Sequence, residues 1–502
     1  MPSPPNVVML VTDNQSADSL GCYGNVEHET PRVDRLSREG ALFLRAFCTN
    51  GLCSPTRASI LTGLMPSQHG VHIAMPDDDV IPKADDYDVT REFRTLPYTL
   101  RQHDYATAMV GKWHLGNYRC PGHGFDHWVA FTKGHTSDFY DNEVYVDGAR
   151  ERIVGQHIVE HFSDRAIEYL AHRDRGRPFF LQVNYDGPYV LPPTVVGADP
   201  RNPFFERFAE RTFRRFPPID DRLVRSLAAP FDFDLDPAEE YTLASAFNNV
   251  WWTVRMHNDQ ATRANVAAQN ALVDHAIGRV VDSLEAEGLT DNTLVIVTTD
   301  QGNPYGQRGL WGHPQWTDPP FMHDVTFRVP LIVRQPGVVD PQRVVDRVVS
   351  HCDLFPTVLE HVGLGDVVID NSPGRSFAPA LRGEPLDGWR DEAYFEAETA
   401  RSLRTPEFLY TSHLAGTGEP ELYDLVADPE QWTNVAAAPE RAATVAGLDV
   451  LLTEFFRQYS NPRYDLWNGG TGQAMVSRYL LFKERYGRDW DVTMDIGPAY
   501  AG

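Results

Sequence analysis

The sequence runs NVVMLVTD over residues 6–13 and TLVIVTTD over residues 293–300, two short apolar stretches that each end at an aspartate. Continuous β-branched runs of this length predict strands that are buried on both faces of an α/β sheet. Open α/β sheets bind their ligands just beyond the carboxyl ends of such strands. Asp13 and Asp300 therefore form a candidate pair of site residues, although they lie far apart in the chain.

Helical patterns separate these two strands, and further strands accompany them. We expect helices at residues 32–39, 54–62, 159–171 and 261–287, and strands at residues 179–183 and 329–333. Gly288 follows the last of these helices and ends it shortly before the second apolar run. This arrangement is typical of the α/β class.

The length of the chain predicts more than one structural unit, because 502 residues exceed what one simple core holds. We assign residues 1–370 to a large domain, in which a stretch rich in Pro, Arg and Phe at about 190–240 is an insertion. Residues 371–458 are expected to form a smaller C-terminal α+β subdomain, and the aromatic tail at 459–502 to pack on the core or on a neighbouring subunit. The elements expected in the subdomain are short antiparallel strands at 392–395 and 421–425 and a helix at 439–457.

Composition and charge limit the classes of function. The chain has 45 basic and 70 acidic residues and a net charge of −25, which argues against binding to nucleic acid. A small anionic substrate remains compatible with this charge, because a local cluster of cations can dominate the field inside a cleft. Five cysteines without a CxxC pair are typical of a reducing compartment. No basic flank precedes the first apolar run and no stretch is long enough to span a membrane, so we expect a cytoplasmic protein without a membrane partner.

The run CSPTR at residues 53–57 carries the strongest chemical signal. With Pro55 in the first turn, it predicts that Cys53 begins a short helix whose Ile60 and Leu61 face a core. The dipole and the free N–H groups at a helix N-terminus favour an anion. Cys53 is therefore a candidate nucleophile for an anionic ester, and the alternative is an ordinary turn that begins a helix.

Residues 51–63 resemble the signature of the type I sulfatases, Cys-x-Pro-x-Arg, in the alkaline phosphatase superfamily. Further blocks resemble those of the same family and follow in its order up to about residue 436, so that the tail from about residue 460 lies outside the resemblance. These blocks lie at residues 6–13, 21–24, 30–36, 111–116, 299–302, 328–333, 353–357 and 421–425. The resemblance implies an alkaline phosphatase-like fold, in which helices sandwich a large mixed β-sheet.

The resemblance implies hydrolysis of a sulfate ester. In the family a separate formylglycine-generating enzyme oxidises the signature cysteine, here Cys53, to formylglycine. The hydrated aldehyde attacks sulfur with one oxygen and releases the alcohol, and its second oxygen then expels sulfate and restores the aldehyde. Unmodified, Cys53 would be a thiol beside a metal ion and would lack this activity.

The resemblance also implies one divalent cation, held by Asp13, Asn14, Asp300 and Gln301 together with the group formed at Cys53. These oxygen ligands favour Ca²⁺, and after it Mg²⁺, over Zn²⁺. The family usually has a second aspartate where Asn14 stands and an asparagine or histidine where Gln301 stands. Because Asn14 removes one negative charge, we expect weaker metal binding here. The alternative is that Asp13 and Asn14 only cap a turn.

Three basic residues complete the nucleophile side of the site that the resemblance implies. Arg57 would hold the nucleophile as a fixed fork of donors. Lys112 would bridge the nucleophile and a sulfate oxygen, and His114 would orient or deprotonate the nucleophile. Lys112 and His114 belong to the block GKWHLG at residues 111–116, for which the alternative is a solvated turn.

The first departure from the family pattern lies after the strand at residues 179–183. The family commonly carries Pro-His-x-Pro there, whereas this sequence reads DGPYVL over residues 186–191. Tyr189 fills the histidine position more naturally than Asp186. A phenol of ordinary pKa donates a hydrogen bond but is a different general acid from imidazole.

The second departure lies at the position of a family lysine that contacts the sulfate. The run GLWGH over residues 309–313 puts His313 there, and His323 is the competing candidate. Counting back from Arg328 instead would place Pro319 at this position and leave no side-chain donor. The two departures move the protonating groups from one side of the cleft to the other. We therefore expect either low activity or a leaving group that differs from the family norm, such as the acidic leaving group of an aryl sulfate.

The sequence thus predicts a sulfatase that hydrolyses a small anionic ester. One alternative is a phosphodiester or phosphonate monoester hydrolase that uses the same site. Another is a degenerate member of the family that binds an anion without turnover.

Overall fold

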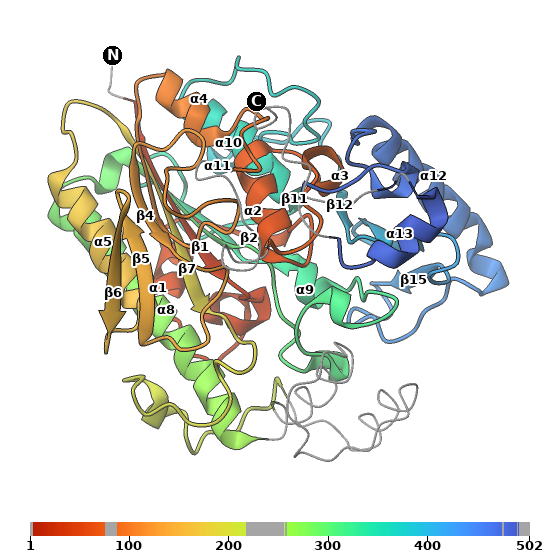
Figure 1. The fold of residues 1–502 in the computed structure, drawn as a ribbon, viewed down its shortest axis with the longest axis horizontal. Helices are drawn as coiled ribbons and strands as arrows, with labels where there is room; N and C mark the ends of the chain where they lie inside the picture. Colours follow the sequence, from red (N-terminus) through yellow and green to blue (C-terminus); the bar gives the residue numbers. More distant parts are fainter. Residues whose placement is uncertain are drawn as a thin grey trace.

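One large sheet with helices on both faces dominates the fold, and a smaller sheet lies beside it (Figure 1). The structure, a computed structural model, describes residues 4–75, 88–216, 256, 259–473, 476–488 and 490. Its mixed sheet between helices confirms the predicted α/β class and the large mixed sheet. The smaller sheet and its helices lie on the right in Figure 1, in the C-terminal part of the chain.

Eleven strands form the large sheet within the described residues. They are β1 (Asn6–Asp13), β2 (Ala41–Phe47), β3 (Ala106–Gly111), β4 (His127–Phe131), β5 (Asp141–Val146), β6 (Ala149–Val154), β7 (Phe179–Pro188), β8 (Thr293–Thr299), β9 (Arg328–Val329), β10 (Leu331–Arg334) and β11 (Arg343–Ser350). Their order is β11-β2-β10-β8-β1-β7-β3-β4-β5-β6, and β9 pairs with β2. The central strands β8, β1, β7, β3 and β4 are parallel, whereas β10, β5 and β6 run antiparallel to their neighbours.

Helices cover both faces of this sheet. They are α1 (Pro31–Glu39), α2 (Cys53–Thr62), α3 (Pro66–His69), α4 (Leu96–Gln102), α5 (Ile158–His172), α8 (Gln260–Ala286), α9 (Asp324–Phe327), α10 (Leu354–His361) and α11 (Ala378–Leu381). Side chains of α2, α4 and α10 share one buried cluster with the sheet, and side chains of α1, α5 and α8 share the other. The sheet therefore separates two hydrophobic cores.

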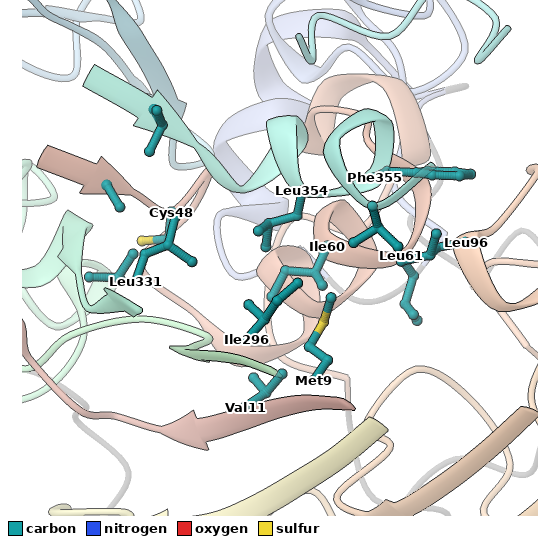
Figure 2. Close-up of a cluster of buried hydrophobic side chains, with 14 of the residues drawn as sticks. Met9, Val11, Cys48, Ile60, Leu61, Leu96, Ile296, Leu331, Leu354 and Phe355 are labelled. Carbon is teal, nitrogen blue, oxygen red and sulfur yellow. The ribbon is translucent and has the colours of Figure 1, made fainter. Parts of the chain in front are cut away.

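The strand β1 is buried on both faces, as its apolar run predicts. Met9 and Val11 point into one core and Val8 and Leu10 into the other, because successive side chains of a strand alternate. Figure 2 shows the first core, in which Ile60 of α2 lies close to Met9. This packing holds α2, the helix that begins at the predicted nucleophile, against the central strand.

The C-terminal part contains a second, antiparallel sheet. Its strands are β12 (Ala393–Glu396), β13 (Ala400–Arg404), β14 (Phe408–His413) and β15 (Glu421–Asp424), and they pair in chain order. Two helices follow, α12 (Ala442–Gln458) and α13 (Tyr479–Tyr486). The described part of the tail contacts the large domain, since the backbone N–H of Asn461 donates to Ser67 O and Gln473 donates to His69 O.

Two predicted elements differ from the structure. The strand expected at 329–333 is wrong as one strand, because Pro330 lacks an N–H group and separates β9 from β10. The helix expected at 439–457 begins later, since Pro439–Arg441 form a 3-10 turn before α12.

The expected insertion at 190–240 lies partly outside the described residues, from position 217 on. Its described part packs Phe205, Phe208 and Phe213 against alanines of α8. Across the described ranges, every helix is too short or too polar to cross a lipid bilayer.

Candidate active site

The candidate site lies where β1 and β8 end. These strands pair in parallel, with Thr12 opposite Thr299, so Asp13 and Asp300 reach the same edge of the sheet. Asp13, Cys53 and Asp300 each offer one ligand atom, and these atoms lie within 4.8 Å of one another. The two strand-end acids thus meet in the fold, and α2 brings the cysteine to them.

Cys53 is the first residue of α2, and its side chain is buried among polar groups. Its Sγ lies 3.6 Å from Asp13 Oδ1, 3.6 Å from Lys112 Nζ and 3.3 Å from Gln301 Nε2. Burial, reinforced by the charge of Asp13, raises the pKa of the Cys53 thiol well above its ordinary value. Because the thiolate is the nucleophilic form of cysteine, an unmodified Cys53 has little reactivity in this site.

Two cations hold the two carboxylates. Lys112 Nζ donates to Asp13, and Arg57 Nη2 donates to Asp300 Oδ2 at 2.6 Å. Burial opposes the ionisation of Asp13, but Lys112 and Arg57 outweigh it and hold the pKa of Asp13 below its ordinary value. Burial likewise opposes the charge of Lys112, but Asp13 and Cys53 keep the pKa of Lys112 above its ordinary value. Asp13 and Lys112 are therefore an ion pair at neutral pH.

The donor set fits a divalent cation bound through oxygen. Burial, and after it the negative charge of Asp13, raises the pKa of Asp300, so a further cation at this place would favour the ionised form of Asp300. Gln301 Oε1 is buried and has no hydrogen-bond partner among the described residues. Carboxylate and amide oxygens are the ligands that hard cations prefer.

Asn14 is held at the same place by its backbone and by a second amide. Its backbone N–H donates to Asp300 Oδ1 at 3.2 Å, and its Oδ1 accepts a hydrogen bond of 2.8 Å from Asn303 Nδ2. Asn14 adopts a positive φ of 61°, a conformation that asparagine tolerates better than most residues. Its side-chain oxygen is therefore shared with Asn303, whereas Gln301 Oε1 is not shared.

His114 faces the site as a neutral base. Its Nε2 lies 2.8 Å from Met75 O, and because a carbonyl only accepts, Nε2 carries the proton. Its Nδ1 is buried without a partner in the described parts of the chain. Burial, and after it Lys112, lowers the pKa of His114 well below its ordinary value. Gly134 permits this packing, since a Cβ there would lie 2.2 Å from the imidazole.

Tyr189 and Asp186, at the end of β7, both lie beside Lys112. The backbone N–H of Tyr189 donates to Asp13 O at 3.2 Å, and Lys112 Nζ lies 5.2 Å from the centre of its ring. Asp186 Oδ1 lies 3.6 Å from Lys112 Nζ, and burial raises the pKa of this carboxyl. For the histidine position of the family motif, the sequence favoured Tyr189 over Asp186, whereas the fold brings both residues to the site.

Of the two histidines proposed for the lysine position, His313 interacts with the nucleophile side. Its Nδ1 lies 3.1 Å from Gly51 O, and its charge would interact with Asp13 and Lys112. Burial lowers the pKa of His313 to about 4. His323 interacts instead with Arg308 and Glu421.

Two groups at the site have no counterpart in the sequence reasoning. His135 stacks on Tyr189 with 5.4 Å between ring centres, and its charge would lower the pKa of both His114 and His313. Asn303 holds the amide of Asn14. His135 belongs to no motif that a sequence would reveal. Asn303 lies two residues after Gln301, and this closeness to a predicted metal ligand is a signal in the sequence that points to the site.

The sequence matches known proteins over most of its length. The Sulfatase family model matches residues 5–364, and the model of the N-sulphoglucosamine sulphohydrolase C-terminal region matches residues 312–458. An N-acetylglucosamine-6-O-sulfatase of Bacteroides thetaiotaomicron is 28% identical over 517 residues, which cover 91% of this chain and 87% of that protein. The human N-acetylglucosamine-6-sulfatase is 25% identical over 484 residues, or 86% of this chain and 81% of that protein.

Solved structures show the same fold. A structure of a protein in complex with its substrate D-glucosamine-2-N,6-O-disulfate has a TM-score of 0.71 and 26% identity, and covers 92% of this chain and 99% of that chain. The phosphonate monoester hydrolase of Agrobacterium radiobacter has a TM-score of 0.67 and 23% identity, and covers 91% of this chain and 96% of that chain. The second likeness concerns the fold alone.

The fold and the site define a hydrolase of the alkaline phosphatase superfamily, and in this chain a helix N-terminus and two strand-end acids meet at Cys53. The chain belongs to the sulfatase family, of the type I class. It is a sulfuric ester hydrolase.

Proposed function

We propose that this sulfatase works through a formylglycine formed from Cys53 and one divalent cation, Ca²⁺ in preference to Mg²⁺. The observation that carries the proposal is the Cys53 thiol, which lies at the N-terminus of α2 between Asp13 and Lys112 and has a raised pKa. A thiol in this state is a poor nucleophile, whereas the hydrate of an aldehyde formed at Cβ of Cys53 would need no thiolate. Oxidation requires a formylglycine-generating enzyme as a partner during maturation.

The proposed cation would be held by Asp13, Asn14, Asp300 and Gln301 together with the oxygen formed at Cys53. When bound, it would polarise that oxygen and the sulfate group. Gln301 supports this assignment with an unshared buried oxygen, and Asn14 would share its oxygen with Asn303. The large number of ligand oxygens and their flexible amides favour Ca²⁺ over the strictly octahedral Mg²⁺.

Three side chains would handle charge and protons on the nucleophile side. Arg57 donates a hydrogen bond to Asp300 and would thereby hold this carboxylate in place at the end of β8. Lys112 lies close enough to Cys53 to contact both the nucleophile and a sulfate oxygen. His114 presents a neutral Nδ1, which would accept the proton of the nucleophile.

The other side of the site lacks a strong proton donor. His313 donates its Nδ1–H to Gly51 O, and its lowered pKa leaves Nε2 unprotonated at neutral pH. Tyr189 is held beside Lys112 and would donate at most a phenolic hydrogen bond. We therefore propose that acidic leaving groups, as in aryl sulfates, react fastest, because they depart with little protonation.

A sulfated amino sugar is the second candidate substrate. The match with an N-acetylglucosamine-6-O-sulfatase over 91% of the chain favours it. Such a substrate releases an alcohol of high pKa, so it depends more on proton donation than an aryl sulfate does. Turnover of 4-nitrophenyl sulfate, of N-acetylglucosamine 6-sulfate and of a 4-nitrophenyl phosphonate monoester separates these substrates from each other.

We also propose a cytoplasmic location, which the five free cysteines support.

Mass spectrometry of the tryptic peptide at residues 46–57 tests the proposal. After co-expression with a formylglycine-generating enzyme, we expect Cys53 to have lost its sulfur and to carry an aldehyde. Cys48 lies in the same peptide and serves as the internal control, because it should remain a thiol that iodoacetamide alkylates. An active preparation in which both cysteines are alkylated would contradict the proposal.

The cation is tested on the same matured protein after chelation. We expect Ca²⁺ to raise the melting temperature at a lower concentration than Mg²⁺ does, because a ligand that binds only the folded state stabilises it. Equal effects of the two ions would contradict the preference.

A further inference from the structure

A second cavity, of about 800 Å³, lies between the segment that follows β8 and the C-terminal sheet. Its walls come from residues 306–309, from the start of α9, and from residues 429–432 after β15. Its basic side chains and its imidazole belong to Arg45, Arg214, Arg215, Arg308, Arg328, Arg404 and His323. We call this cavity the arginine cleft. None of the residues around Cys53 described above lines it.

The charge of the arginine cleft is opposite to that of the protein. Six arginines line it against three carboxylates, whereas the whole chain has 45 basic and 70 acidic residues. Arg45 pairs with Asp346 and Arg404 pairs with Asp324, so these two arginines are compensated. Arg215 and Arg328 share the single carboxylate of Asp18, so one positive charge remains on these three residues. A concave surface lined by one sign of charge concentrates ions of the opposite sign.

Arg308 lacks a direct ion pair within the described residues, although Asp428, Glu421 and Glu430 lie close enough to interact with its charge. Its Nη1 donates to the carbonyl oxygens of Glu430 and Gln431. Its guanidinium stacks on Trp432 at 5.0 Å, and its Nε is buried without a partner. Arg308 also has a positive φ of 60°, a conformation that costs energy in a residue with a side chain and is often found at ligand sites.

His323 is an unsatisfied polar side chain in the wall of the same cleft. It is 6% exposed, and its ring lies between those of Phe321 and Tyr423. Neither ring nitrogen has a hydrogen-bond partner among the described residues. Burial, and after it Arg308, lowers the pKa of His323 to about 3, so the neutral ring presents one N–H donor. Buried polar groups are nearly always paired, so a partner from outside the chain is expected here.

We infer that the arginine cleft binds a sulfate-type oxyanion, contacted by Arg308 and His323 and held in the field of the other arginines. Planar guanidinium groups match the oxygens of sulfate in pairs, and the imidazole N–H supplies one more donor. Two sources have this chemistry: free sulfate, which the enzyme produces, and a second sulfate group on a substrate. The inference does not rest on formylglycine at Cys53, because the cleft uses none of the residues there.

Isothermal titration calorimetry of the matured, metal-loaded protein with sodium sulfate tests the inference. We expect Arg308→Met to lose one bound sulfate or to weaken it at least tenfold, while kcat/KM for 4-nitrophenyl sulfate changes less than twofold. Arg214→Met, at an exposed edge of the cleft, should weaken the same site without endangering the fold. Melting temperatures show whether each variant is folded.

Arg382→Met is the matched control, because it removes one positive charge from an ion-paired arginine outside the cleft. It should leave sulfate binding unchanged. The inference is overturned if Arg308→Met and Arg214→Met both bind sulfate as the parent protein does, or if Arg382→Met loses as much. Since calorimetry needs no turnover, an inactive nucleophile would leave this test intact.

The kinetics of two sugars distinguish the two sources once the binding site is shown. For a substrate with a second sulfate, Arg308→Met should raise KM at least fivefold for a disulfated sugar and leave KM for the matching monosulfated sugar unchanged. Unchanged KM values for both sugars, together with lost sulfate binding, assign the cleft to free sulfate.

Discussion

The two halves of the active site are held in different ways. The nucleophile half consists of Asp13, Cys53, Arg57, Lys112 and Asp300, with side chains 0% to 3% exposed. The leaving-group half consists of Tyr189, His313 and the exposed His135, which follow strands or lie in the segments between them. Parallel strand ends and a helix N-terminus fix the first half, whereas the second depends on connecting segments.

The largest effect is expected at Cys53, in the centre of the nucleophile half. Cys53→Ala should reduce kcat/KM for every sulfate ester by about 10³-fold or more, because alanine cannot be converted to formylglycine and leaves no oxygen for covalent catalysis. Cys48→Ala is the control, since Cys48 is also buried but does not belong to the group formed by Asp13, Cys53 and Asp300, and its Sγ lies 3.8 Å from Thr326 O. Similar losses of kcat/KM in both variants would contradict the prediction that Cys53, and not Cys48, is the nucleophile.

Lys112 should show the next largest effect, independent of the leaving group. Lys112→Gln removes the cation between Asp13 and Cys53, and we expect kcat to fall by about 10²- to 10³-fold. The loss should be equal for an aryl and an alkyl sulfate, since Lys112 in its proposed role would contact the nucleophile and the sulfate but not the leaving group. Lys133→Gln, an exposed lysine, serves as the control. A loss that depends strongly on the leaving group would place Lys112 in the other half.

Tyr189 should show a smaller effect that does depend on the leaving group. For Tyr189→Phe we expect kcat/KM to fall by roughly tenfold for an alkyl sulfate and by less than about threefold for an aryl sulfate. His313→Asn should lower kcat/KM by less than about threefold for both esters, because Nε2 of His313 carries no proton at neutral pH. The parent enzyme should accordingly prefer the aryl sulfate. Similar turnover of the two esters by the parent enzyme would show that a strong proton donor exists in the leaving-group half.

The smallest effect is expected for His157, which lies at the beginning of α5 and supports the leaving-group half through Val159. His157 caps this helix, because its Nδ1 accepts the N–H of Val159, and Val159 packs against Gly187, where a Cβ would lie 2.6 Å from it. Burial lowers the pKa of His157 from 6.5 to about 3. The unfolded chain therefore binds more protons between these values, and the stability that His157 contributes above pH 6.5 is lost as the pH falls.

Denaturant titrations at pH 7 and pH 5 measure this contribution. The loss from His157 at pH 5 should be roughly 2 kcal/mol. His157→Asn keeps a capping side chain but removes the titrating group. Between pH 7 and pH 5 the free energy of unfolding of this variant should therefore fall by roughly 2 kcal/mol less than that of the parent protein. An identical pH dependence in both proteins would contradict the assigned neutral state of His157.

The nucleophile half of the site could be predicted from the sequence better than the leaving-group half. Asp13 and Asp300 could be paired from sequence, because each ends a continuous apolar run and central parallel strands end at a common edge. His313 and His323 could not be separated, because the segment after β8 follows no periodic pattern and its path depends on packing. His135 reaches Tyr189 only through the folded arrangement of the connection between β4 and β5.

The amino-acid order alone establishes the α/β class, the central strands, the helix that begins at Cys53 and the family. These features depend on local patterns, namely apolar runs, a proline in a first turn, and short motifs with regular spacing. The raised pKa of the Cys53 thiol, the interaction of His313 with Asp13 and Lys112, and the arginine cleft emerge only from the assembled chain. Burial and the distances between charges distant in sequence produce them, and neither quantity exists before the elements pack.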